Sequence, residues 1–239
     1  MLSQQVQTQW TEKNRRTLWF VMNKTKSMLK IDVKPTIAQA FYILQTYFRQ
    51  TPENEIKILS LAAASLAIST KLKEHYLSIQ NILQALIRVC ASIPTSATRS
   101  LINGFEYSST FYPTDAEVEI VKSAEIELMS ALNFQFDIEL PFQYLDEWED
   151  EIKEHIPVEK QPSFIQKCQL DVCLILCSES CVDVPAEVAA AAAIDDVFAK
   201  ELQKDSTFDK KISAKYGNGV YNVALECIHK ESALTAQRA

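Results

Sequence analysis

The sequence has very little glycine, with only 3 in its 239 residues. Tight turns between strands and phosphate-binding loops depend on glycine, because glycine adopts positive φ angles without a steric penalty. An all-β or doubly wound α/β protein of this length would need more of it. The shortage therefore favours an all-helical protein and excludes a glycine-rich nucleotide-binding loop.

Long uncharged runs are missing too, since none reaches the roughly 18 residues that a membrane span needs. The three histidines, His75, His155 and His229, are scattered along the chain. Cys173, Cys177 and Cys181 follow one another at helical spacing, which favours thiols packed in a helix over a zinc site. No signal-peptide pattern is present. We therefore expect an intracellular protein in a reducing environment, with no metal and no membrane contact.

Charge is unevenly distributed in a chain whose net charge is −7. Residues 1–50 hold eight Lys and Arg against two Asp and Glu, a net charge of +6. Residues 115–160 hold fourteen Asp and Glu against three Lys, a net charge of −11. This polarity suits a protein partner whose charge is also uneven, although solvated helix faces give the same pattern. The acidic balance argues against general nucleic-acid binding.

Apolar residues recur at helical spacing in the first half of the chain, with Pro, Ser and Thr between the segments. This pattern predicts helices at 12–29, 35–49, 53–72, 78–91 and 115–132, and a long loop with one short helix at 91–114. The stretch 58–70 has no charged residue, so the third helix should lie at the centre of a bundle. Thr114 and Glu117 have the spacing of a capping box.

The same pattern begins again in the second half. It predicts helices at 141–155, 163–180, 185–202, 206–217 and 220–232. The Ala-rich helix at 185–202 stands third in its half, as the uncharged helix does in the first half. The sequence therefore predicts an all-α fold built by tandem duplication of a five-helix bundle.

Glu125 is unusual because we expect it at the centre of an apolar stripe on the helix predicted at 115–132. Five apolar residues lie within about 60° of it around the helix: Val118, Val121, Leu128, Met129 and Leu132. A carboxylate in such surroundings is costly unless it has a partner. That partner is either within the protein, such as Lys71 at the end of the uncharged helix, or on another chain.

Four segments resemble the cyclin family, in the right order and spacing. "IKILSLAAASLAISTKLKE" is similar to the third helix of the cyclin box, and "PTIAQAFYILQTYF" to the second. "AEIELMSALNFQFDIELPFQYL" resembles the fifth helix with its link to the second box, and "VPAEVAAAAAIDDVFA" the third helix of that box. The resemblance covers residues 12–230. It implies an N-terminal helix and first box in residues 1–137, and a second box and C-terminal helix in residues 138–239.

The resemblance implies a regulatory subunit that binds a cyclin-dependent protein kinase and activates it allosterically. In that family, a Lys ending the third helix and a Glu in the fifth hold the C-helix region of the kinase. The matching residues are Lys71 and Glu125, with Leu72, Met129 and Phe136 as apolar neighbours, although such residues more often belong to a core than to an interface. The family implies no catalysis, no cofactor, no small-molecule substrate and no direct nucleic-acid contact. It also implies a nuclear location, with the cytoplasm as a second possibility.

The chain departs from the family's pattern in two places. Lys73 stands where a first acidic residue usually follows the Lys, so only Glu74 remains, and kinase choice can change as a result. The first helix contains Trp19 but does not match well the short motif with which cell-cycle cyclins recruit substrates. The first and second helices and the loop at 91–114 are more similar to transcription-type cyclins such as C, H, K and L. We therefore expect a role in transcription, with a cell-cycle cyclin as the alternative.

Two rival functions remain open on the same fold. A protein of the general transcription factor IIB type would bind DNA, but it needs a basic surface, and the acidic stretch 115–160 argues against one. A helical scaffold without a kinase is the other. An enzyme is not expected, because no nucleophile with a base, metal motif or glycine loop can be assembled, and the carboxylate run at 146–151 is typical of a solvated helix face. Fold alone does not decide among these functions.

Overall fold

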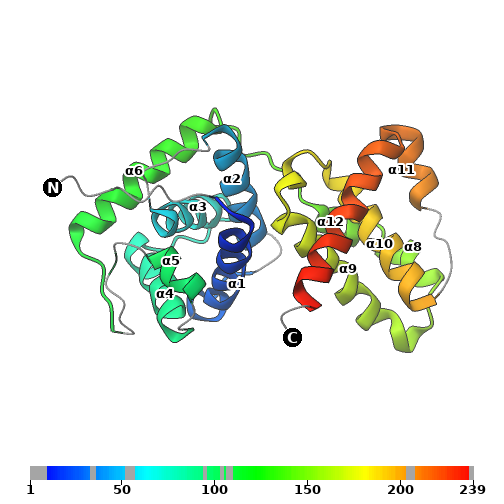
Figure 1. Cartoon of the computed structure of the whole chain (residues 1–239), viewed down its shortest axis with the longest axis horizontal. Coiled ribbons are helices and arrows are strands. Elements are labelled where there is room, and N and C mark those ends of the chain that lie inside the picture. Colours follow the sequence, from blue (N-terminus) through cyan, green and yellow to red (C-terminus); the bar gives the residue numbers. More distant parts are fainter. Residues whose placement is uncertain are drawn as a thin grey trace. The chain divides into compact units, whose positions relative to one another are not determined.

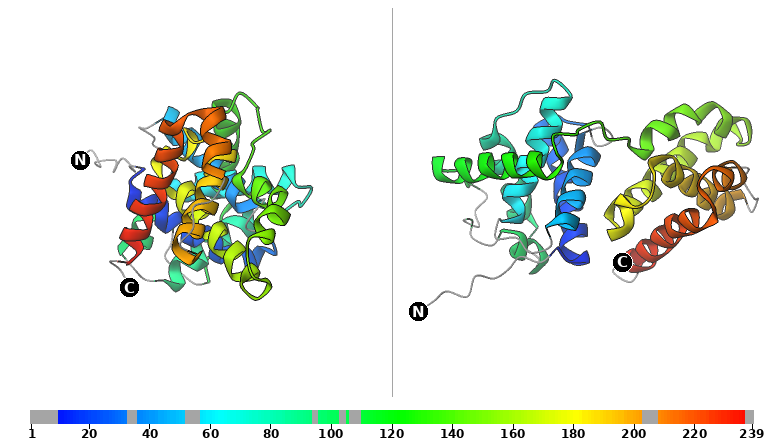
Figure 2. Two further views of the ribbon diagram at one scale, coloured as in Figure 1. Left: turned by 90° about the vertical axis from the view of Figure 1, so that its right-hand side faces the viewer. Right: turned by 90° about the horizontal axis from the view of Figure 1, so that it is seen from above.

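The computed structural model describes residues 10–32, 36–51, 57–93, 96–102, 105, 110–202 and 208–236. Over these ranges the regular structure is helical, and none of them contains a strand. The chain divides into two compact units, residues 1–138 and 139–239, each of which is a bundle of helices (Figures 1 and 2). The prediction of an all-α fold is confirmed.

The first unit follows the predicted order of helices. It holds α1 (Glu12–Leu29), α2 (Ala38–Gln50), α3 (Ile58–Leu72), α4 (Ile79–Ser92), α5 (Ser96–Ile102) and α6 (Asp115–Ala131). α1 has the predicted bounds, and α5 is the short helix expected within residues 91–114. The starts predicted for the second and third helices, at residues 35 and 53, lie outside the described residues.

Side-chain caps explain where three of these helices begin. Thr11 and Ser78 accept hydrogen bonds from the backbone N–H groups of Asn14 and Asn81, at the starts of α1 and α4. At the start of α6, the N–H of Glu117 donates to Thr114 Oγ1 at 3.3 Å, and the N–H of Thr114 donates to Glu117 Oε2 at 2.8 Å. The predicted capping box is therefore confirmed.

α3 forms the centre of the first unit. Every residue from Ile58 to Thr70 is buried, and α2, α4, α5 and α6 pack against this helix (Figure 1). Its alanines bring neighbouring backbones close, while each fully buried large aliphatic side chain contributes about 1.5–3 kcal/mol to stability. The central position predicted for this helix is thus confirmed.

The second unit repeats the plan. It holds α7 (Pro141–Glu147), α8 (Glu149–Glu154), α9 (Gln161–Cys177), α10 (Ala186–Leu202), α11 (Phe208–Tyr216) and α12 (Asn218–Ala236), with short 3₁₀ turns at Val158–Lys160 and Glu179–Val182. The Ala-rich α10 is the central helix, and α7, α9, α11 and α12 pack around it (Figure 2).

The prediction of one continuous helix at 141–155 is wrong, because the chain breaks at Trp148 between α7 and α8. Trp148 has φ −94° and ψ 7°, outside the usual helical range. Its buried indole packs against the ring of Phe208 in α11, with centroids 5.2 Å apart, and against Tyr144 at 5.7 Å. This packing favours a local departure from helical geometry.

The cysteines are free thiols, and all except the partly buried Cys173 are buried. Burial raises the pKa of the Cys90 thiol to about 12, which makes it unreactive at neutral pH. Among the described residues, no group of three or more His, Cys, Asp and Glu side chains could hold a metal ion. In the same ranges, no helix is both long and apolar enough to cross a membrane.

Candidate functional site

The end of α3 and the middle of α6 meet at an ion pair between Lys71 and Glu125. Lys71 Nζ donates a hydrogen bond to Glu125 Oε1. Glu125 is only 8% exposed, whereas the side chain of Lys71 is 46% exposed. The carboxylate is therefore covered by protein, and the ammonium group faces solvent.

Glu125 lies at the edge of the buried face of α6 rather than at its middle. Val121, Ala124 and Leu128 are fully buried and define the centre of that face. The neighbouring helix is α3, whose last turn presents Lys71 to the carboxylate. Because a covered carboxylate is costly without a partner, the ion pair satisfies a group that the packing of α6 has placed there.

The backbone ends α3 in a way that exposes several consecutive side chains. Glu74 adopts the left-handed conformation with φ 57°, and the N–H of His75 donates to the carbonyl of Thr70 at 2.9 Å. This is the hydrogen bond of a Schellman motif, in which glycine is the usual left-handed residue. The turn leaves every residue from 71 to 76 exposed. The charges that follow the uncharged helix thus face solvent.

The three apolar residues predicted beside the pair do not share one environment. Leu72 is 41% exposed. Met129 and Phe136 are partly buried and pack against the core of the first unit. The carbonyl of Phe136 also accepts a long hydrogen bond of 3.5 Å from Gln39 Nε2 in α2, which ties the segment after α6 to the bundle.

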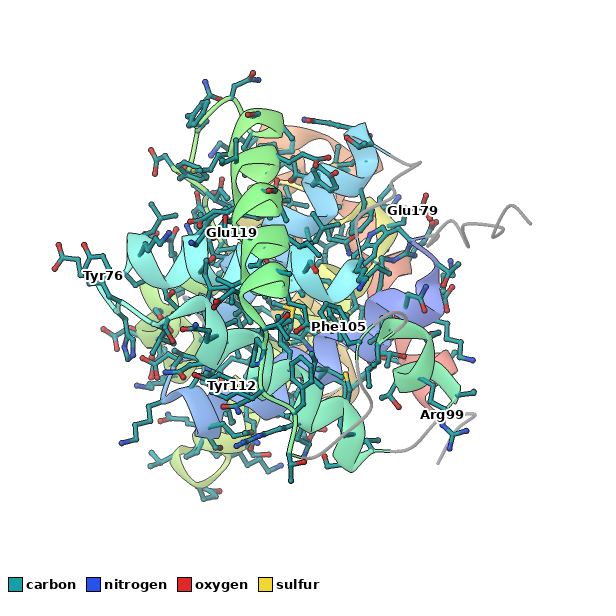
Figure 3. All side chains as sticks on the ribbon, turned by 90° about the vertical axis from the view of Figure 1, so that its left-hand side faces the viewer. Tyr76, Arg99, Phe105, Tyr112, Glu119 and Glu179 are labelled. Atoms are coloured by element: carbon teal, nitrogen blue, oxygen red, sulfur yellow. The ribbon has the colours of Figure 1, made fainter. Side chains whose placement is uncertain are left out.

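Three large exposed apolar residues near the pair in the sequence were not identified by sequence reasoning. Tyr76 is 78% exposed and projects from the connection between α3 and α4 (Figure 3). Ile126 is 62% exposed and follows Glu125, and Phe134 is 64% exposed just beyond α6. Ile126 had a detectable signal, because it lies about 100° around the helix from Glu125, on the polar side. The exposure of Phe134 depends on a left-handed backbone conformation with φ 56°, which the sequence does not predict.

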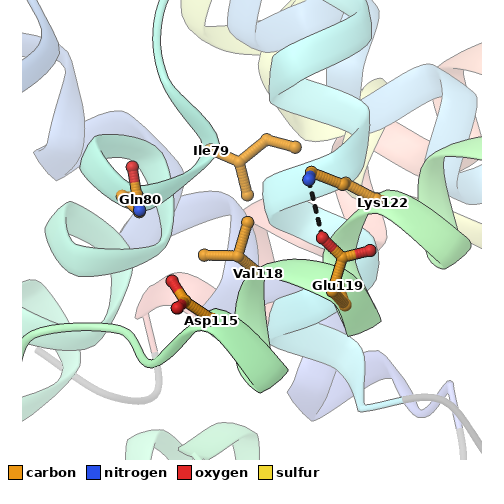
Figure 4. A pocket seen from close by; sticks show the side chains of 6 residues that line it. All are labelled: Ile79, Gln80, Asp115, Val118, Glu119 and Lys122. Atoms are coloured by element: carbon orange, nitrogen blue, oxygen red, sulfur yellow. Dashed lines mark hydrogen bonds and ion pairs between the residues drawn. The ribbon is translucent and has the colours of Figure 1, made fainter.

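A shallow hollow of about 290 Å³ extends the site along α6, between the first turns of α4 and α6 (Figure 4). Ile79 and Val118 face each other across it. Asp115 and Glu119 make its rim acidic, and Lys122, one turn before Glu125, bonds to Glu119 at 2.7 Å. This hollow suits an apolar or basic side chain of a partner.

The arrangement is suited to binding. A carboxylate oxygen of Glu125 accepts hydrogen bonds, and the solvent-facing ammonium of Lys71 has further N–H groups to donate. Such a donor and acceptor held side by side can bond the backbone of another chain. The exposed apolar side chains at Leu72, Tyr76 and Ile126 are of the kind that protein interfaces cover. We call the residues Lys71, Leu72, Tyr76, Glu125, Ile126 and Phe134 the α3–α6 surface.

Comparison with known proteins identifies the fold. No protein-family model matches the sequence, and no curated protein matches it either. Among solved structures, the chain is similar to the X-ray structure of a viral cyclin from herpesvirus saimiri, with a TM-score of 0.58 at 14% sequence identity. The match covers 95% of this chain and 88% of that one. The predicted fold class, a tandem duplication of a five-helix cyclin-box bundle, is confirmed.

Proposed function

We propose that the protein is a cyclin-type regulatory subunit that binds a cyclin-dependent protein kinase and activates it allosterically. The observation that carries this proposal is the Lys71–Glu125 pair, in which a covered carboxylate of α6 meets the last turn of the central helix, with exposed apolar residues close to both in the sequence. The similarity of the fold to that of a viral cyclin supports it.

The proposed mechanism needs no chemistry from this chain. Glu125 and Lys71 bond the C-helix region of the kinase, and Leu72, Tyr76 and Ile126 supply apolar contact. If the contacts form only with the active conformer of the kinase, binding shifts the kinase toward that conformer. To shift the ratio of active to inactive kinase from 1:99 to 99:1, the protein must bind the active conformer about 5.5 kcal/mol more favourably than the inactive one. Two polar residues do not supply that alone, so the exposed apolar residues are part of the proposed site.

The proposal also includes the process in which the protein acts and its location in the cell. We infer a role in transcription and a nuclear location, because the first and second helices and the segment 91–114 resemble transcription-type cyclins. A cell-cycle cyclin remains the alternative. The net charge of −11 over residues 115–160 favours a protein partner over DNA, and thereby the kinase over a transcription factor IIB type of function.

The test is binding and activation of purified cyclin-dependent kinases by the whole chain. We expect one kinase of a panel to bind the wild type and gain activity toward a peptide substrate. The double variant Lys71→Ala/Glu125→Ala should lose both effects while keeping its helical circular dichroism. Glu149→Ala/Lys153→Ala is a matched control, because it removes a partly exposed Lys–Glu pair from α8 in the second unit. If no kinase binds, or if the first variant binds as well as wild type, a scaffold without a kinase is the better explanation.

A further inference from the structure

A second hollow, of about 360 Å³, lies in the first unit between the end of α1 and one face of α4. These two helices pack side by side (Figure 1), and the connection between α3 and α4 contributes His75 and Leu77 to the wall. None of the six residues of the α3–α6 surface lines it. It is therefore a separate feature of the fold.

The hollow is positively charged. Lys30 lies just after α1, His75 in the connection, and Arg88 on α4, so the three groups come from three different elements. No acidic side chain lines the hollow. The chain as a whole carries a net charge of −7, so this local excess of cationic groups is contrary to the overall balance. Convergent cations without a counter-charge are the arrangement that attracts an anion.

Arg88 gives the strongest indication that the hollow binds an anion. Its side chain is partly buried, and its buried Nε has no hydrogen-bond partner. Within the described parts of the chain, no ion pair involves Arg88, Lys30 or His75. A covered guanidinium donor without an acceptor is unfavourable, and a bound anion would satisfy it. Gln84, which also lines the hollow, is held by its amide nitrogen, which donates to the carbonyl of Phe111 at 2.9 Å.

The rest of the wall indicates an anion that belongs to a side chain. Leu29 and Ala85 are buried, Leu77 is partly buried, and Met28 is 48% exposed at the rim. A free inorganic ion would make no use of this apolar surface. The side-chain amide of Asn81, two turns before Arg88 on the same face of α4, is a further donor.

We propose that this hollow binds a phosphorylated serine or threonine side chain of a partner protein. A phosphate group carries nearly two charges and three acceptor oxygens, so it can use Lys30, His75 and Arg88 at once. A carboxylate carries one charge and is fully served by a single bidentate arginine. The apolar wall then contacts the residues that flank the phosphorylated side chain.

The test uses the whole chain and two matched pools of degenerate fluorescent peptides, one with a central phosphoserine and one with serine. Fluorescence anisotropy should show binding of the phosphorylated pool at least about tenfold tighter than that of the serine pool. Arg88→Gln should lower the affinity for the phosphorylated pool by about tenfold or more. Arg99→Gln is the control, because it removes an exposed arginine of α5 that does not line the hollow.

Further variants keep the test decisive if Arg88→Gln folds poorly. Lys30 and His75 are exposed, so Lys30→Gln and His75→Gln should fold normally and each weaken phosphopeptide binding severalfold. The proposal is overturned if these variants bind like wild type. It is equally overturned if a glutamate pool binds as tightly, or if inositol trisphosphate binds more tightly than any peptide, since the occupant is then a carboxylate or a lipid headgroup. No kinase takes part, so failure here leaves the proposed function unaffected.

Discussion

His229 Nε2 in α12 lies 3.0 Å from Asp196 Oδ1 in α10, at the edge of a cluster of charged groups in the second unit. Asp196 is 5% exposed and also pairs with Lys200. Asp171 of α9, 9% exposed, bonds to the same carboxylate. Burial, and then the hydrogen bond with Asp196 and its charge, raise the pKa of Asp171 to about 7, although Lys200 acts in the opposite direction.

The stability of the second unit should therefore depend on pH. Between about pH 4 and pH 7 the folded state keeps a proton on Asp171 that the unfolded state has released, so the free energy of unfolding falls as pH rises through this window. Asp171→Asn should flatten this dependence and raise the free energy of unfolding above pH 7 by about 1–3 kcal/mol. Urea unfolding followed by circular dichroism measures both effects. The exposed Asp150→Asn is the control, and a loss of stability in Asp171→Asn at pH 8 would contradict the argument.

The two residues of the Lys71–Glu125 pair should contribute unequally to stability. Lys71→Ala leaves a covered carboxylate without its partner, and we expect a loss of about 1–3 kcal/mol. Glu125→Ala leaves an ammonium that is already half exposed, and we expect a loss of about 1 kcal/mol or less. Urea unfolding of both variants and of the double variant gives the coupling energy. Equal losses for the two single variants would show that burial of Glu125 is unimportant.

The end of α3 offers a stabilising substitution. Glu74 has φ 57°, which is unfavourable for a residue with a Cβ atom. Glu74→Gly should raise the free energy of unfolding by about 0.5–1 kcal/mol, and thermal unfolding would show it as a higher Tm. Glu74→Ala removes the same carboxylate but keeps the Cβ atom, so it should not be stabilising. A gain in both variants would trace the effect to charge and not to the backbone.

A substitution on the α3–α6 surface should weaken kinase binding without changing the stability of the protein. Because Ile126 is 62% exposed, Ile126→Ser should leave the free energy of unfolding within about 0.5 kcal/mol of wild type. Kinase affinity should nevertheless fall by about tenfold if the side chain is covered in the complex. Ile120→Ser is the matched control, since Ile120 is 39% exposed and lies about 120° further around α6. Calorimetry with the purified kinase compares the two variants, and equal affinities would remove Ile126 from the site.

Features that depend on neighbours in the chain could be predicted from the sequence. The bounds of α1 and the capping box of Thr114 and Glu117 follow from residues a few positions apart. The burial of α3 follows from thirteen residues without a charge, Ile58–Thr70, because a helix apolar on all sides must be covered. Lys71 was a candidate partner of Glu125, yet the same pattern allowed a partner on another chain.

Only the tertiary structure decided which distant groups meet. The hollow around Arg88 combines α1, α4 and the segment before α4, and Asp171 meets Asp196 because α9 packs against α10. The break at Trp148 and the exposure of Phe134 could not be predicted either, because each depends on a backbone conformation that local propensity does not specify. Helical periodicity determines which face of a helix is buried. The position of one helix along its neighbour depends on how all their side chains pack together, and that information is spread over the whole chain.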